Sequence, residues 1–93
     1  MTVSATGVFD ASAPWRLSEQ VSLRDEAFGA LAYHHGNRRL VFLKSRELVT
    51  LVRSLDAFEN VDDAVASMLS PALRDQYVKA LSSLASSEII RER

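Results

Sequence analysis

The sequence predicts an α+β domain in which a three-stranded antiparallel sheet is followed by three helices. Two observations predict this class. Apolar and polar residues alternate over much of the first half of the chain, which is typical of half-buried strands. After Ser45 the apolar residues instead recur at helical spacing. The change falls within residues 40–55, so this stretch joins the last strand directly to the first helix.

Length and composition narrow the class of protein further. The 93 residues suffice for one domain with a single core, and 47% of them are apolar. No apolar run approaches the roughly 20 residues of a membrane-spanning helix, and the N-terminus lacks the pattern of a secretory signal. We therefore expect a cytoplasmic protein with no membrane partner. The absence of cysteine excludes disulfides and thiolate chemistry.

The N-terminal segment differs from the rest in composition. Residues 1–14 are rich in Ser, Ala and Thr, and we expect them to form a flexible tail. Trp15 is then the first residue to contact a domain that spans residues 15–93. The alternative is an exposed Trp15 that belongs to the tail.

The first two strands are expected between residues 20 and 34. Val21 and Leu23 alternate with polar neighbours, and the polar pair at 25–26 is expected to turn the chain. Residues 27–34 form the second strand, although their alanines also suit a helix.

A hairpin and an edge strand complete the sheet. Gly36 and Asn37 both tolerate positive φ, so they favour a tight hairpin turn. Residues 38–43 return as the third strand. The result is an antiparallel meander whose last strand lies at an edge.

Each helix has a recognisable start. Ser45 supplies an N-cap oxygen for the first helix, and Asn60 does so for the second. The pair at 70–71, Ser followed by Pro, starts the third, because proline suits the first helical position. Ile89 and Ile90 form a short extended piece, and residues 91–93 are expected to fray.

No residue pattern indicates catalysis. His34 and His35 are adjacent, so on a strand they point to opposite faces, and no third ligand lies at an obvious spacing. We expect them in solvent at the tip of the hairpin. Neither a nucleophile elbow nor a glycine-rich phosphate loop is present. The sequence therefore predicts a protein that is not an enzyme, with no catalytic residue, cofactor or metal.

Basic residues gather in and just after the edge strand, at Arg38, Arg39, Lys44 and Arg46. They have two interpretations. The charges can protect a free strand edge from aggregation. Alternatively, the edge accepts a peptide as a fourth strand and the charges select an acidic partner. The residues alone leave both open.

The order of these motifs resembles the PqqD-like family (RiPP recognition elements), winged-helix domains that recognise precursor peptides of ribosomally made natural products. The resemblance covers about residues 21–90. It is carried by VSLRDE at 21–26, GALAY at 29–33, LKS at 43–45, LVTLVRSLD at 48–56, VDDAVASML at 61–69 and ALSSL at 80–84. A longer match over residues 15–65 looks like the mycofactocin branch. The chain departs from the family at Lys44, where Asn is common, and at Glu88, where Gly is common.

The resemblance implies a winged-helix-like, non-catalytic chaperone. It would hold the mycofactocin precursor peptide, MftA, and present it to the radical S-adenosylmethionine (SAM) maturase, MftC. In such domains the peptide lies as an added strand between the third strand and the third helix. The peptide-binding residues implied here are Arg38, Arg39, Leu40, Val41, Phe42 and Leu43 on the strand, and Arg74, Tyr77, Val78 and Leu81 on the helix.

Further expectations concern the contacts of that peptide. Precursors of this system are rich in Glu with interspersed Leu and Val, which suits an arginine-edged strand, and Arg39 is expected to contact a peptide Glu. Leu40 and Phe42 share one face of the strand, while Arg39, Val41 and Leu43 share the other. One of the first pair is expected to form a pocket wall, but the sequence leaves open which face meets the helix.

Two other functions remain as alternatives. Three helices after strands can form a nucleic-acid-binding winged helix, but the net charge of −1 and the mixed charges of the third helix argue against a nucleic-acid partner. The free strand edge could also pair with its own copy in a homodimer.

Overall fold

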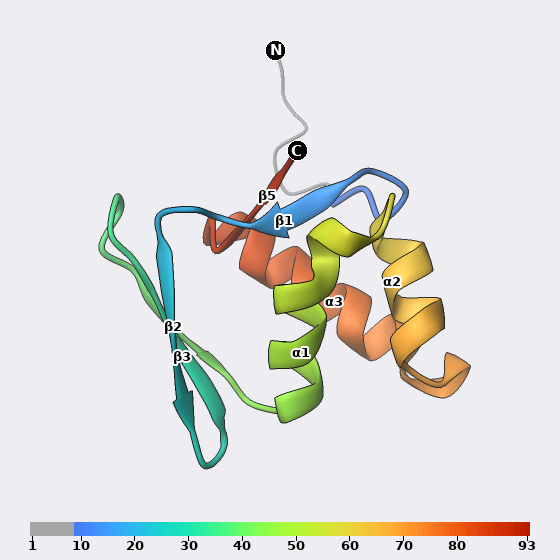
Figure 1. Cartoon of the computed structure of the whole chain (residues 1–93), viewed down its shortest axis with the longest axis horizontal. Helices are drawn as coiled ribbons and strands as arrows, with labels where there is room; N and C mark the ends of the chain where they lie inside the picture. Colours follow the sequence, from blue (N-terminus) through green and yellow to red (C-terminus); the bar gives the residue numbers. More distant parts are fainter. Residues whose placement is uncertain (1–8) are drawn as a thin grey trace.

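The computed structural model describes residues 9–93, which form two antiparallel sheets and three α-helices (Figure 1). In chain order the elements are β1 (Trp15–Leu17), β2 (Val21–Glu26), β3 (Gly29–His34), β4 (Leu40–Leu43), α1 (Arg46–Ser54), a 3₁₀ turn (Leu55–Ala57), α2 (Val61–Met68), a second 3₁₀ turn (Pro71–Leu73), α3 (Arg74–Ser86) and β5 (Ile90–Glu92). The predicted α+β class, with a three-stranded meander followed by three helices, is confirmed. No helix in this part of the chain is long and apolar enough to cross a membrane.

The first hairpin turns two residues later than expected. Asp25 and Glu26 are not a break, because they continue β2 and pair with Ala30 and Gly29 of β3. The turn consists of residues 27–28. Gly29 has a φ of +149°, and a Cβ on it would lie 2.1 Å from the carbonyl oxygen of Leu43, so no larger residue fits there.

The second hairpin also differs from the expected tight turn. Its loop runs over residues 35–39, and the positive φ of 63° belongs to Arg38 rather than to Gly36 or Asn37. The edge strand is therefore the shorter β4. His34 is buried, contrary to expectation, and its Nδ1 accepts hydrogen bonds from the backbone N–H groups of Gly36 (3.0 Å) and Asn37 (3.1 Å), which satisfy this nitrogen away from water.

The expected helix starts are mostly confirmed. Ser45 Oγ accepts a hydrogen bond from the N–H of Leu48 at 3.0 Å, and Asn60 Oδ1 accepts one from Asp63 at 2.7 Å. Pro71 begins a 3₁₀ turn instead of the α-helix, so α3 itself starts three residues later than predicted.

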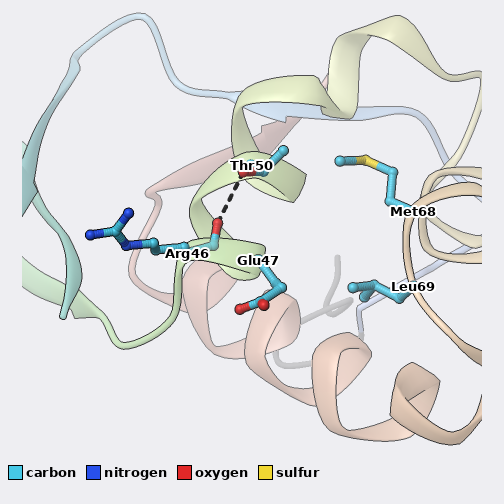
Figure 2. A pocket seen from close by; sticks show the side chains of 5 residues that line it. All are labelled: Arg46, Glu47, Thr50, Met68 and Leu69. Atoms are coloured by element: carbon cyan, nitrogen blue, oxygen red, sulfur yellow. Dashed lines mark hydrogen bonds between the residues drawn. The ribbon is translucent and has the colours of Figure 1, made fainter. Parts of the chain in front are cut away.

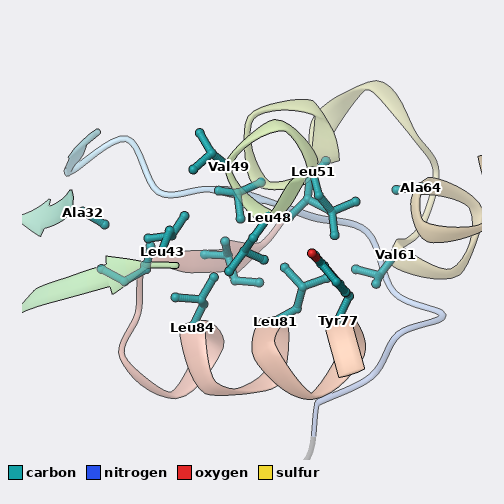
Figure 3. Packing of buried hydrophobic residues seen from close by; sticks show 14 of the residues in the cluster. Ala32, Leu43, Leu48, Val49, Leu51, Val61, Ala64, Tyr77, Leu81 and Leu84 are labelled. Carbon is teal, nitrogen blue, oxygen red and sulfur yellow. The ribbon is translucent and has the colours of Figure 1, made fainter. Parts of the chain in front are cut away.

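The core lies between the inner face of the three-stranded sheet and the helices (Figure 3). Its largest fully buried side chains come from β4, every helical segment except the second 3₁₀ turn, and the C-terminal strand region. They are Leu43, Leu51, Val52, Leu55, Val61, Leu81, Ile89 and Ile90. Together they join the sheet and the helices into one packed body.

The two-stranded sheet was not predicted. β1 pairs with β5 from Trp15↔Glu92 to Leu17↔Ile90, and these strands lie close to α1 and the end of α3 (Figure 1). The expected fraying of residues 91–93 is wrong, since the N–H of Arg93 also donates to the carbonyl of Pro14 at 2.9 Å. Glu88, one of the two positions at which the sequence departs from the PqqD-like pattern, has a φ of 63°, a backbone conformation that glycine adopts most easily.

The packed body extends upstream of Trp15. Residues 1–8 of the expected tail lie outside the described residues. In the part that is described, Ala13 is buried, and the rings of Phe9 and Trp15 lie 4.8 Å apart between centroids. The N–H of Asp62 donates to the carbonyl of Ala11 at 3.0 Å, so this segment is tied to α2.

Candidate functional site

Strand β4 has one paired and one open edge. Among the described residues it pairs only with β3, with Ala32 opposite Val41 and Ala30 opposite Leu43. His34 also donates its N–H to the carbonyl of Arg39 at 2.9 Å. Because hydrogen-bonded pairs alternate in an antiparallel ladder, Val41 and Leu43 bond to β3. The N–H and C=O groups of the residues between and before them therefore point to the open edge.

The residues with outward-pointing backbone groups are Leu40 and Phe42. Their side chains lie on the outer face of the sheet, away from the helices, and are 57% and 55% exposed. Val41 and Leu43 lie on the inner face, with Leu43 fully buried in the core. The inner pair is thus the one that faces α3, which answers the question that the sequence left open.

Two hydrogen bonds join β4 to α3 at both ends. Before the strand, Asn37 Nδ2 donates to the carbonyl of Ser87, directly after α3, at 3.3 Å. After the strand, Ser45 Oγ and the hydroxyl of Tyr77, in the first turns of α3, lie 3.0 Å apart. The strand and the helix therefore run side by side in opposite directions. Figure 3 shows Leu43 of β4 above Leu84 of α3.

A hollow of about 190 Å³ lies where β4 leads into α1 and faces α3. We call it the β4–α3 hollow. Its lining is Lys44, Ser45, Leu48, Gln76, Tyr77 and Ala80. The walls are mainly apolar, with a lysine at the junction, so the hollow suits an apolar side chain that lies close to a negative charge.

The structure brings only some of the expected helix residues to this hollow. Tyr77 lines it and is itself buried. Leu81 is fully buried in the core, and the guanidinium of Arg74 faces α2, where its Nη2 lies 2.6 Å from Asp62 Oδ1. That hydrogen bond raises the pKa of Arg74. Val78, one turn after Arg74, is half-buried against the core and does not line the hollow.

Five lining residues were absent from the expected set: Lys44, Ser45, Leu48, Gln76 and Ala80. Gln76 and Ala80 are four residues apart and follow the same side of α3. That spacing is visible in the sequence. The rotation of α3 relative to β4 is not visible there, because it depends on the packing of the helix against distant parts of the chain.

The basic residues near β4 are available for a partner. Arg38, Arg39, Lys44 and Arg46, which we call the basic edge, are all exposed. None of them forms an ion pair within residues 9–93. The arginines that do form ion pairs in this range are Arg24, Arg53, Arg74 and Arg91. The side chains of the basic edge are therefore not held in ion pairs among the described residues.

A second hollow, of about 240 Å³, lies between α1 and the end of α2 (Figure 2). Met68 and Leu69 form its apolar side, while Arg46 lies at the opposite side and extends away from them. Glu47 lies between, and Thr50 Oγ1 donates to the carbonyl of Arg46 at 3.0 Å. The polar groups do not converge on one point. Over residues 9–93 there is also no group of three His, Cys, Asp or Glu side chains that could hold a metal.

An open strand edge beside a hollow lined by a helix is an arrangement that suits peptide binding by strand addition. Comparison with known proteins identifies the family. Residues 14–91 match the family model described as the peptide chaperone MftB family, and the chain belongs to that family.

Relatives support this assignment across nearly the whole chain. A peptide chaperone MftB from Mycobacterium ulcerans (strain Agy99) is 42% identical over 88 residues, which is 94% of this chain and 81% of the relative. Proteins of the same name from Mycobacterium tuberculosis (strain H37Rv) and Mycolicibacterium smegmatis (strain mc(2)155) are each 40% identical over 86 residues. These alignments cover 91% and 88% of this chain, and 79% and 81% of the relatives. No solved structure matches significantly.

Proposed function

We propose that this chain is a peptide chaperone of mycofactocin biosynthesis that binds the precursor peptide MftA as an added strand on β4. It then presents the peptide to the radical SAM maturase MftC. The observation that carries the proposal is the open edge of β4 beside the β4–α3 hollow. The names of the relatives, all peptide chaperones, support the same class of ligand.

The backbone groups of β4 supply only part of the affinity. Leu40 and Phe42 each direct one N–H and one C=O to the open edge, and each hydrogen bond made there contributes a net of roughly 0.5–1.5 kcal/mol. Ordering a flexible peptide offsets much of this gain. Side-chain contacts in the β4–α3 hollow and with the basic edge must therefore contribute most of the specificity.

Charge favours an acidic peptide over a second copy of this chain at the same edge. In an antiparallel pair of β4 strands that matches the outward-pointing residues, with Leu40 opposite Phe42 of the second copy, Arg38 would lie opposite Lys44. Like charges that face each other across strands are destabilising. An acidic peptide in that position would instead pair with them, which supports strand addition by the precursor.

The test is amide hydrogen exchange, followed by NMR on the whole chain with and without MftA. Without peptide, the amides of Leu40 and Phe42 should exchange quickly, while those of Val41 and Leu43 are already protected by β3. With saturating peptide, protection should appear at Leu40 and Phe42. Saturable binding that leaves these two amides unprotected would contradict strand addition, and the absence of saturable binding would contradict the chaperone function.

A pair of matched variants tests, in the same titration, whether the peptide enters the β4–α3 hollow. Ala80→Glu places a bulky negative charge in the β4–α3 hollow and should weaken binding of an acidic peptide by about tenfold or more. Ala66→Glu makes the same change at an exposed position of α2 and should leave the affinity unchanged. Equal affinities for the two variants would show that the peptide does not enter the hollow.

A further inference from the structure

The outer face of the three-stranded sheet carries a cluster of apolar side chains that the core does not use. We call it the outer patch, and it consists of Phe28, Leu31, Tyr33, Leu40 and Phe42. Phe28, Leu40 and Phe42 are the exposed large apolar residues of the described chain, at 45%, 57% and 55%. Single exposed apolar residues are ordinary, but a contiguous cluster indicates an interaction surface.

The strand register explains why these residues meet. Leu31 lies opposite Phe42, and Tyr33 lies opposite Leu40, all on the face that points away from α1. Phe28, in the turn between β2 and β3, folds back over the end of β4, where its ring centroid lies 5.7 Å from that of Phe42. The cluster is thus continuous from the turn to the open edge.

The outer face changes from polar to apolar across the sheet. On the β2 side it presents Ser22, whose Oγ is 2.7 Å from His35 Nε2, and Arg24, whose Nε is 2.9 Å from Glu26 Oε2. In the middle, Leu31 and Tyr33 are only half exposed. The most exposed apolar side chains are on β4 itself, so the patch is open chiefly at the unpaired edge of β4.

We propose that the outer patch is a second half of the peptide site, which reads every second side chain of the bound strand. This inference rests on the proposed function. A strand added to β4 alternates its side chains between the two faces of the sheet, because the side-chain period of a strand is two. One set faces α3 and the β4–α3 hollow. The other set lies beside Leu40 and Phe42.

The proposal specifies the chemistry of the ligand. Cross-strand neighbours have Cβ atoms about 4.5–5.5 Å apart, so the outward side chains of the peptide directly contact Leu40 and Phe42. These contacts favour apolar side chains at positions i and i+2 of the bound segment. Acidic residues flank them, since Arg39 lies before β4 and Lys44 directly after it. The recognised segment is therefore a short strand with an apolar outward face and acidic ends.

Continuity with the open edge identifies the peptide as the occupant. Leu40 and Phe42 are the same residues whose backbone groups are directed at an added strand. A peptide held by those groups cannot avoid placing side chains against the patch. A flat partner protein or a second copy would instead have to cover the sheet as far as the charged pair of Arg24 and Glu26.

The first test combines two substitutions on the outer face, Leu40→Thr and Phe42→Thr. Threonine keeps the β-propensity of the strand while removing most of the apolar surface. With MftA as the probe, the double variant should bind about tenfold more weakly or worse, and saturating peptide should still protect the amides of residues 40 and 42. Arg24→Thr, on the polar side of the same face, is the control and should bind like the wild-type chain.

A second measurement uses the unmodified chain and so does not depend on the folding of any variant. Each apolar residue in the protected segment of MftA is replaced in turn by serine. Losses of affinity at alternate positions i and i+2 that contact Phe42 in NMR, in addition to any losses at positions that face the hollow, support the proposal. Losses confined to alternate positions, all in contact with Ala80 or Tyr77, overturn it.

The outcomes separate this inference from the proposed function. If wild-type chain binds MftA and gains protection on β4, but the double variant binds with the same affinity, the outer patch is not part of the peptide site. If the double variant keeps its affinity for MftA but no longer forms a complex with MftC, the outer patch binds the maturase instead. If it keeps its affinity for MftA but loses a dimer that the wild-type chain forms in sedimentation, the outer patch binds a second copy. If the wild-type chain does not bind MftA at all, the proposed function fails as well.

Discussion

The two sheets of this domain differ in how the arginines beside them are bonded. The β1–β5 sheet is short, buried on one side and held by charged side chains, since Arg91 bonds to Glu19 (Nε to Oε1, 2.7 Å) and Arg93 bonds to the carbonyls of Asp56 and Phe58. The β2–β3–β4 sheet ends in an open edge whose arginines form no ion pairs among the described residues. Arginine thus has a structural role at the β1–β5 sheet, whereas the arginines beside the open edge of β4 are free for a partner.

The largest expected difference between the two sheets is in stability. Ile90→Ala in β5 removes a side chain that is 1% exposed and should lower the free energy of unfolding by about 2–5 kcal/mol. Phe42→Ala on β4, which is 55% exposed, should lower it by less than about 1 kcal/mol. Denaturant unfolding of both variants measures this. Comparable losses would show that the open edge is part of the stabilising core.

Reversing the charge of one arginine should weaken peptide binding at the open edge of β4 but not at the β1–β5 sheet. Arg39→Glu at the basic edge should weaken MftA binding by about tenfold, because it repels an acidic peptide. The affinity of the wild-type chain should also fall as salt is raised, and that of the variant should fall less.

Arg16→Glu in β1 is the matched control for this variant. It changes the net charge by the same amount at the other sheet. Calorimetry at two salt concentrations should therefore show wild-type affinity for this control. Equal weakening by both variants would mean that total charge, rather than the basic edge, attracts the peptide.

The smallest expected effect is on the stability of the fold at low pH. The hydrogen bond from Arg91 lowers the pKa of Glu19 from 4.5 to about 2. A carboxyl group with a lowered pKa in the folded state stabilises the fold above its unfolded pKa, and that contribution is lost as the pH falls from about 4.5 towards about 2. The stability difference between wild-type chain and Glu19→Gln should therefore shrink over this window in urea unfolding. The effect is small because both side chains are exposed. A difference that stays constant with pH would show that the pair does not act through the charge of Glu19.

Local signals in the sequence predicted the elements well. Ser45 and Asn60 cap their helices as expected, because a cap depends on residues only a few positions away. The positive φ of the second hairpin fell on Arg38 instead of on glycine, and the same loop is tied to the end of α3 by Asn37, which donates to the carbonyl of Ser87. That partner is 50 residues away and leaves no local trace.

Two features of the candidate site could not be predicted for the same reason. Leu40 and Phe42 are as apolar as Val41 and Leu43, so only the packing of the sheet decides which pair is buried. Leu81 belonged to the predicted groove because its helix was correctly predicted, but the rotation of α3 places it in the core. The pairing of β1 with β5 involves strands of three residues each, too short to carry a periodic pattern.

The long-range pairing of β1 with β5 also has a consequence for the order of folding. Trp15 and Glu92 are separated by almost the entire described chain, whereas β2 and β3 are joined by a two-residue turn. Closing the longer loop costs roughly 2–3 kcal/mol more chain entropy. Contacts of such high sequence separation form late in folding. We therefore expect β4 and its open edge to be assembled on the nascent domain before the two ends of the chain are joined.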